Sequence, residues 1–326
     1  MKTNYIMLFL IILPIMSVFS SGNLELVNTQ EMELNNIDDI RISYSSEKVI
    51  LLMGTTDKLI INEYMNENNE KFFAHITKTG NTLIVESGRR PFRPVFNFFN
   101  RRLEVYLPRS YGNVININTK SGNIESSADL LCSKINIESS SGRIRLNSIS
   151  ADTVNVKNSS GNINIDSIRG NASVKSSSGN VDIGNINGEA SIESNSSRIV
   201  IDKFTGILTA KSSSGRIQCT VAEVRGDITL TTSSGNINCS IIETEGDISL
   251  SSSSGTVRLN VPQNLSFNFS SRTSSGGLST PFSDKLFSPV TDRNLTQGVI
   301  GANGNSEDIP TVKIRTSSGS IKVDWV

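Results

Sequence analysis

Apolar and polar residues alternate in short, evenly spaced segments along most of the chain. From residue 121 onward each segment follows a Ser-Gly step, with apolar residues two and four positions after the glycine, as at Ile163 and Ile165 after Gly161. Polar residues such as Asn162 and Asn164 fill the positions between them. A period of two is typical of a strand with one buried and one solvated face, so the pattern predicts many short strands.

The Ser-Gly steps recur at intervals of 18 to 21 residues, apart from one gap of 43. We predict that their glycines are structural turn glycines, because glycine tolerates a positive φ and neighbouring serine hydroxyls can bond the turn backbone. They are Gly122, Gly142, Gly161, Gly179, Gly215, Gly235, Gly255, Gly276 and Gly319, with Ser197 in the equivalent place between Gly179 and Gly215. A second series lies halfway between the steps: Gly170, Gly188, Gly206, Gly226 and Gly246.

A half-repeat of about nine residues holds a strand of about five residues and a turn. It cannot bury its own apolar face. Stacking identical repeats buries these faces at about 4.8 Å per repeat. The sequence therefore predicts an all-β fold, a parallel β-solenoid of 18–21-residue rungs with two short strands per rung and an N-terminal β cap. A β-sandwich of hairpins is the alternative, but the fixed period favours the solenoid.

The same pattern divides the chain into five segments. We expect a signal peptide at residues 1–20, an N-terminal β cap region continuous with the solenoid at 21–118, and solenoid repeats at 119–279. An inserted loop at 280–310 and a closing rung at 311–326 complete the chain, and Trp325 is expected to cover the end of the stack. Within the cap, Thr79-Gly80-Asn81 predicts a hairpin turn.

The N-terminus has the pattern of a secretory signal peptide. Lys2 precedes an apolar run at residues 6–19, and the small residues Ser20, Ser21 and Gly22 follow it. The run is shorter than the roughly 20 residues that a membrane-spanning helix needs, although an uncleaved anchor is the alternative. No lipid attachment is expected there, because the first cysteine is Cys132. We therefore expect an exported protein of the cell envelope, in the periplasm or at the cell surface, or a secreted one.

Composition and charge narrow the class of protein. The 326 residues include 31 Lys plus Arg and 31 Asp plus Glu, and this zero net charge argues against nucleic-acid binding through a basic face. Three cysteines, an odd number, argue against a disulfide framework. Cys219 and Cys239 both lie four residues after a step glycine, so they are expected to point inward on adjacent rungs, as a disulfide or as two small core residues.

Residues for catalysis or metal binding are scarce. His75 is the only histidine, and no His/Cys cluster has the spacing of a zinc site. Ile163 and its equivalents stand where calcium-binding β-rolls place Asp. Asp227 and Asp247 are the one pair of acidic residues in the same position on neighbouring rungs. The sequence therefore predicts no catalytic residue, no cofactor, no metal and no enzyme activity.

One stretch, residues 89–102, is rich in arginine and phenylalanine and contains two prolines. It is a candidate contact with a partner or with an anionic membrane surface, because aromatic anchors with cationic flanks suit both. The alternative is a long connection between strands whose phenylalanines fold back over the cap core. The candidate contact residues are Arg89, Arg90, Phe92, Arg93, Phe96, Phe98, Phe99, Arg101 and Arg102.

The repeat resembles a known bacterial family. The tandem T/S-x-S-G-x-I steps with Gly-x-I-x-L half-steps, the opening segment LEVYLPRSYGNVININTKSGNI and the final TSSGSIKV are similar to the "putative adhesin" β-strand-repeat domain of unknown function. That domain is related to auto-transporter adhesin head domains. The resemblance covers most of the chain after the predicted signal peptide. It implies an exported or envelope-associated β-solenoid and supplies no catalytic residues.

Three functions are compatible with this sequence. The favoured one is a non-enzymatic adhesin of the cell surface or envelope that binds an extended ligand, a glycan or an envelope or host protein, through its repeat ladders. The second is a periplasmic scaffold or partner-binding protein. The third, a polysaccharide-active enzyme, requires clustered acids on one face, and only Asp227 and Asp247 provide a pair.

Overall fold

The computed structural model describes residues 24–91, 99–290, 292–301 and 309–326. Up to the start of the repeats its strands are β1 (Glu25–Glu33), β2 (Asp39–Tyr44), β3 (Lys48–Met53), β4 (Lys58–Met65), β5 (His75–Thr79), β6 (Thr82–Glu86), β7 (Arg101–Leu107), β8 (Val114–Thr119) and β9 (Ile124–Ser126). The repeat strands are β10 (Leu130–Ser139), β11 (Ile144–Asn158), β12 (Ile163–Ser176), β13 (Val181–Ser194), β14 (Ile199–Ser212), β15 (Ile217–Val224), β16 (Ile228–Thr232), β17 (Ile237–Thr244), β18 (Ile248–Ser252) and β19 (Val257–Val261). The last strands are β20 (Phe267–Thr273), β21 (Leu278–Ser279), β22 (Leu295–Ile300), β23 (Thr311–Thr316) and β24 (Ile321–Trp325), and two single-turn helices are η1 (Glu70–Phe72) and η2 (Ser283–Lys285).

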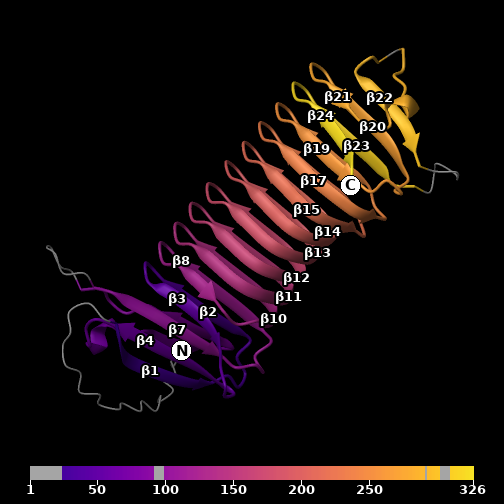
Figure 1. Ribbon diagram of the computed structural model, residues 1–326. Helices are drawn as coiled ribbons and strands as arrows, with labels where there is room; N and C mark the ends of the chain where they lie inside the picture. Colours follow the sequence, from indigo (N-terminus) through magenta and orange to yellow (C-terminus); the bar gives the residue numbers. More distant parts are fainter. Residues whose placement is uncertain (1–23, 92–98, 291, 302–308) are drawn as a thin grey trace.

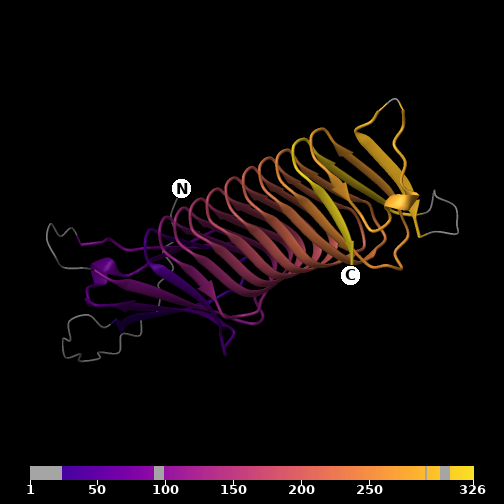
Figure 2. The same cartoon turned by 45° about the horizontal axis from the view of Figure 1, so that its top comes forward.

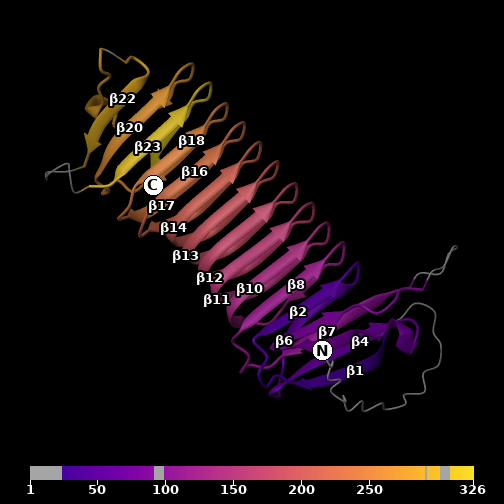
Figure 3. The ribbon, with the colours of Figure 1, turned by 180° about the vertical axis from the view of Figure 1, so that it is seen from behind.

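These strands form one continuous sheet that winds into an elongated stack (Figure 1). Each rung gives the stack a first face, built from the segments after the Ser-Gly steps, and a second face, built from the segments before them. The second face includes β2, β8, β10, β16, β18 and β23 (Figure 3). Strands β11 to β14 are long enough to cross both faces. The pairing is parallel and in register through the repeats, which confirms the predicted β-solenoid.

The core is a set of apolar ladders that run along the stack. Ile144, Ile163, Val181, Ile199 and Ile217 are register partners in successive rungs, and each is completely buried. Branched aliphatic residues fill most of the interior, and Phe204 is a buried aromatic residue within the repeats. Each rung is therefore stable only while its neighbours cover it.

The turn at each Ser-Gly step places backbone against backbone. A Cβ added to Gly179 would lie 1.9 Å from the carbonyl oxygen of Gly161, and the other step glycines of the repeats show the same close approach. None of the step glycines has a positive φ. The predicted reason for these glycines was therefore wrong, because space and not backbone conformation demands them. Positive φ occurs instead in the halfway series, at Gly170, Gly188 and Gly206.

A buried or half-buried polar residue supports these turns from inside. The Ser176 hydroxyl accepts the N–H of Gly179 at 3.0 Å and donates to the Gly179 carbonyl oxygen at 2.6 Å. The residue three places before the step position accepts the same N–H at Ser139, Asn158, Ser194, Ser212, Thr232, Ser252, Thr273 and Thr316. The next two residues of each turn, most of them serines, are exposed, as Ser177 and Ser178 are. The serine-rich edge is thus partly a core element of the fold.

Both ends of the stack are built out of chain order. The first rung, β2 with β3, lies between β6–β7 and β8–β9. In the same way the last rung, β23 with β24, lies between β18–β19 and β20–β21. The segment at 311–326 is therefore the second rung from the end and not the closing one. The C-terminal strand β24 therefore lies inside the stack, as the turned view also shows (Figure 2).

Antiparallel strands finish each end. At the N-terminal end β4 pairs with β7 and β1, and β5 pairs with β6 through the predicted hairpin turn at Gly80, whose φ is 59°. At the C-terminal end β22 pairs with β20, so the segment expected as a loop at 280–310 contributes a strand. Phe282 packs over Phe267 and Phe269 and contacts Trp325 at 5.3 Å. Phe282, more than Trp325, covers the end of the core, because Phe282 is buried and Trp325 is only half-buried.

Replacing Gly179 by alanine tests the backbone contact. The added methyl group would overlap the carbonyl of Gly161, so we expect Gly179→Ala to lower the free energy of unfolding by about 2–4 kcal/mol. Gly277→Ala is the matched control, because nothing lies within 4 Å of the corresponding Cβ. Urea denaturation of both variants measures the difference, and equal stability of the two would refute the steric explanation.

Candidate functional site

The second face carries a groove of about 540 Å³ towards its N-terminal end. A volume of this size is typical of small-molecule and saccharide sites. Five neighbouring strands, β2, β8, β10, β11 and β12, supply its walls through their outward side chains. These are Arg41, Ser43, Asn116, Asn118, Asn136, Glu138, Asn155, Lys157, Ser173 and Lys175.

A ladder of carboxamides runs through this groove. Asn116 donates to the Asp39 carboxylate at 2.5 Å, Asn136 donates to Asn116 at 2.5 Å, and Asn155 donates to Asn136 at 2.8 Å. In-register parallel pairing places Asn116, Asn136 and Asn155 on successive rungs, and Asp39 lies two residues before the register partner of Asn116. Each bond fixes an amide in one orientation. Each amide keeps a second N–H and a second lone pair, which are available to a ligand.

The charges around the amides are mixed. Arg41 is paired with Asp39 at 2.7 Å, and Lys175 is paired with Glu193 at 3.0 Å. Glu138 and Lys157 are exposed neighbours in register, and no ion pair joins them. The groove therefore presents a neutral polar floor between charged edges. The sequence signal for it is an asparagine between two apolar residues in three successive steps, at 115–117, 135–137 and 154–156.

The structure separates the residues of the arginine- and phenylalanine-rich stretch. Phe92, Arg93, Phe96 and Phe98 lie outside the described residues. Arg89 and Arg90 are exposed, but the Arg90 guanidinium is paired with Glu47 at 3.0 Å. Arg102 is half-buried, is paired with Glu104 at 3.0 Å and lies over the Tyr64 ring. The stretch joins β6 to β7, and Phe99 packs edge-on against Phe72 at 5.1 Å. Phe99 therefore behaves as expected for a long connection that folds back over the cap.

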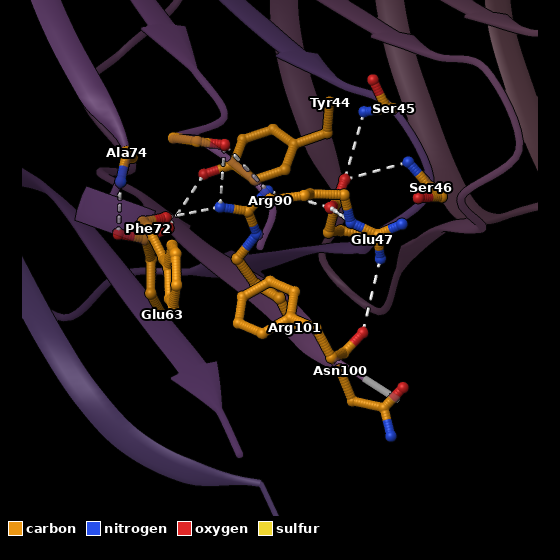
Figure 4. A network of polar contacts seen from close by, with 12 residues as sticks. Tyr44, Ser45, Ser46, Glu47, Glu63, Phe72, Ala74, Arg90, Asn100 and Arg101 are labelled. Carbon is orange, nitrogen blue, oxygen red and sulfur yellow. Dashed lines mark hydrogen bonds and ion pairs between the residues drawn. The ribbon is translucent and has the colours of Figure 1, made fainter. Parts of the chain in front are cut away.

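Arg101 is a correction to the predicted contact residues. Its side chain is fully buried and forms an ion pair with Glu47 at 2.8 Å (Figure 4). It also donates to the Phe72 carbonyl oxygen at 2.5 Å and lies over the rings of Tyr44 and Phe99. A buried, paired guanidinium cannot reach a membrane or a partner. Its role is to hold the cap together.

Glu47 explains why this ion pair exists. Ser45-Ser46-Glu47 takes the place of a Ser-Ser-Gly step, because a Cβ on Gly122 would lie 1.8 Å from the Glu47 carbonyl oxygen. In later turns the serine N–H groups bond to the preceding turn, as Ser178 does to Ser159. Among the described residues no Ser-Gly turn precedes this one, and the Glu47 carboxylate accepts the N–H groups of Ser45 and Ser46 instead, at 3.1 and 2.9 Å. The match of YSSEKVI to the step pattern was a sequence signal for this position.

A second buried carboxylate, Glu63, lies beside this pair. It accepts the N–H of Ala74 at 2.7 Å and bonds from Asn28 and Tyr44 at 2.9 and 3.3 Å. Burial raises the pKa of Glu63, and burial together with Glu63 raises the pKa of the Tyr44 hydroxyl. For Glu47 burial also acts to raise the pKa, but Arg101 and the serine N–H groups outweigh it and lower the pKa. As the pH falls, Glu63 therefore takes up its proton at a higher pH than an ordinary glutamate and Glu47 at a lower pH.

Asp227, Asp247 and the cysteines stabilise the fold. Asp227 accepts the backbone N–H of Asp247 at 3.0 Å, and Asp247 accepts that of Thr311 at 2.8 Å, so both carboxylates hold successive turns. Cys219 and Cys239 are buried register partners with free thiols, and a hydrogen bond to Cys219 and burial raise the pKa of Cys239. Burial raises the pKa of the Cys132 thiol to about 11. Cys219 and Cys239 are therefore two small core residues and not a disulfide, which is the second of the two alternatives that the sequence left open.

Other candidate chemistry is sparse in the part of the chain that the structure describes. His75 is exposed on the edge strand β5, and no group of three or more His, Cys, Asp or Glu side chains there is placed to hold a metal ion. Within the same residues no helix has the length and apolar character needed to cross a membrane. The predicted signal peptide lies outside the described residues.

The stacked Ser-Gly turns and the two-faced parallel sheet define a β-solenoid of repeated half-steps. The chain belongs to the Toastrack DUF4097 family, whose pattern it matches over residues 37–324. This confirms the predicted kinship with a β-strand-repeat domain of unknown function. A search of curated proteins found no match.

Several solved structures are similar at low sequence identity. A "putative adhesin" from Parabacteroides merdae is 11% identical, with 94% of this chain and 98% of that chain covered and a TM-score of 0.43. A "putative adhesin" from Bacteroides fragilis is 13% identical, with 93% and 98% covered and a TM-score of 0.36. A "putative lipid binding protein" from Parabacteroides distasonis is 14% identical, with 93% and 97% covered and a TM-score of 0.34.

Replacing Glu47 by glutamine tests the buried ion pair. Arg101 would keep its charge without a counterion, so we expect Glu47→Gln to lower the free energy of unfolding by about 3 kcal/mol or more at pH 7. Glu125→Gln is the control, because Glu125 forms only a partly exposed pair with Lys48 and the expected loss is under about 1 kcal/mol.

The pH dependence gives a second readout. Because the pKa of Glu47 is lowered on folding, its stabilisation is present above its unfolded pKa of about 4.3 and is lost as the pH falls through the folded value. The difference in stability between wild type and Glu47→Gln should therefore shrink below about pH 4. A difference that stays constant down to pH 2 would show that the charge of Glu47 is not what stabilises the cap.

Proposed function

We propose that this protein is a non-enzymatic binding protein that holds an extended polar ligand, a glycan, in the groove on the second face. The observation that supports it best is the ladder formed by Asn116, Asn136 and Asn155. Carboxamides both donate and accept hydrogen bonds, as saccharide hydroxyl groups do. Their regular spacing of about 4.8 Å per rung suits a ligand that itself has a repeating structure.

Rigidity strengthens this proposal. The floor of the groove consists of strands paired on both sides, and the amides are already hydrogen-bonded to one another. A ligand would then lose little affinity to the ordering of the protein. Individual contacts of this kind are weak, but a polymer that spans several rungs makes many of them.

The absence of catalysis is part of the proposal. The carboxylates of Asp227 and Asp247 accept backbone N–H groups of successive turns, and Asp182 is paired with Arg198 at 2.9 Å. Groups in these roles are poorly placed to act as a general acid and base on a glycosidic bond. Long incubation of the protein with polysaccharides should therefore release no reducing ends.

The periplasmic scaffold alternative receives less support. End-to-end stacking needs open strand edges, but antiparallel strands occupy both ends of this stack. The outer strand β1 carries Glu25, Glu31 and Glu33, and charged residues on an edge strand oppose pairing with another chain. We therefore favour adhesion through the second face, at the cell surface after export.

Asn136→Ala tests the ligand-binding proposal. It removes the central amide of the ladder, and we expect affinity for the best ligand in a panel of neutral oligosaccharides to fall about five- to tenfold. Isothermal titration calorimetry measures the change. Thr229→Ala is the control, because Thr229 lies outward on the same face but outside the groove. An equal loss for both variants, or none for Asn136→Ala, would count against the groove.

Protease treatment of intact cells tests the proposed location. If the protein acts in adhesion, added protease should remove it from intact cells while a cytoplasmic marker survives. Protection until the outer envelope is opened would contradict adhesion and support a periplasmic role.

A further inference from the structure

A second groove, of about 280 Å³, lies at the opposite end of the same face. It is formed by β20, β22 and β23, the strands of the C-terminal cap. The side chains that line it are Ser270, Arg272, Leu295, Gln297, Lys313, Ile314 and Arg315. Three of these are cations, and among the lining residues none is acidic.

The register concentrates these positive charges. Arg272 and Arg315 are direct partners on adjacent parallel strands, and Lys313 lies two residues before Arg315 on the same face. Like charges directly opposite one another destabilise a sheet. Arg272 has a counterion in Asp292, whereas Lys313 and Arg315 have no acidic partner among the described residues. An anion bound beside Lys313 and Arg315 would supply the counterion that these two side chains lack, and it would weaken the repulsion between Arg315 and Arg272.

The preceding rungs of this face are uncharged in the same columns. Ser249 and Ser251 are the register partners of Lys313 and Arg315, and Thr229 and Thr231 come one rung earlier. The cations are therefore local to the end groove and do not continue a basic stripe along the stack. Such a local cluster is typical of a site for one anionic group.

An exposed aromatic side chain borders this groove. Phe287 exchanges two backbone hydrogen bonds of 2.9 Å with Gln297, so the two side chains lie on the same face. Gln297 is the partner of Ser270, which is in turn the partner of Lys313. The Phe287 side chain is 61% exposed, unlike the aromatic residues packed beneath the cap. An amide, a hydroxyl and an aromatic ring thus lie in one row beside the cations.

We propose that this end groove binds an acidic saccharide. Its carboxylate, sulfate or phosphate is held by Arg315 and Lys313, its hydroxyl groups bond to Gln297 and Ser270, and one sugar face packs on Phe287. An anionic membrane is the competing occupant, because Val290 and Val299 are also exposed nearby. We favour the saccharide, since the cations lie in a concave site with neutral hydrogen-bonding partners, which a flat lipid surface does not need. The site does not depend on the function of the first groove.

Calorimetry on the full chain tests the proposal with defined probes. These are a galacturonate trisaccharide, a sulfated chondroitin tetrasaccharide, glucose 6-phosphate, their uncharged counterparts, inorganic phosphate, and vesicles containing phosphatidylglycerol. We expect at least one acidic saccharide to bind saturably, its neutral counterpart not to bind there, and binding to weaken with added salt. Lys313→Gln combined with Arg315→Gln should reduce the affinity tenfold or more.

Matched variants make the test specific. Lys203→Gln combined with Lys211→Gln removes the same charge from exposed residues of β14 outside both grooves and should leave binding unchanged. Phe287→Ala should weaken saccharide binding without affecting inorganic phosphate. Asn136→Ala should leave the end groove intact, so failure of one groove is distinguishable from failure of the other.

Four results would overturn the proposal. The first is that no acidic saccharide binds at millimolar concentration, and the second is that the two double variants lose equal affinity. The third is that inorganic phosphate binds as tightly as the saccharides. The fourth is that vesicles bind in a way that depends on Lys313 and Arg315 while saccharides do not bind. The last would assign the surface to an anionic membrane.

Discussion

The contact between the backbones of neighbouring Ser-Gly turns governs the rest of this structure. The Gly161 carbonyl lies where any side chain at Gly179 would be, and the same contact recurs from rung to rung. A stack this tight keeps the strands in register, and register turns single residues into ladders along the axis. The buried serine, threonine and asparagine residues follow from the same constraint, because each turn N–H that faces inward needs an acceptor.

At the N-terminal end of the stack the requirement for glycine at the turn no longer applies. Where no earlier turn exists, glycine is no longer required, and Glu47 takes its place with a carboxylate that satisfies the orphaned N–H groups. Burying that carboxylate requires Arg101, and the connection from β6 to β7 supplies it. At both ends the outermost rung in space is not the outermost in sequence, so β2 and β23 are each held between two other rungs.

The outward side chains can differ from rung to rung because the inward side chains and the turns hold the rungs in register. Along the second face the same outward column changes from asparagine at one end, through serine and threonine, to lysine at the other. Two grooves with different chemistry therefore share one rigid face, a neutral amide ladder towards the N-terminal end and a cationic cluster at the C-terminal end.

The sequence alone determined the solenoid, its rung length and its inward residues, because these depend on a local period that repeats many times, as at Ile163 and Val181. It also contained the Ser-Ser-Glu step and the three asparagines of the groove, but their meaning depended on which residues lie next to them. Only the tertiary structure decided that Arg101 is buried with Glu47 and that the rung at 311–326 lies second from the end. The physical reason is that a repeat fixes contacts between neighbours in sequence order, whereas the caps are built from contacts between segments that no local pattern relates.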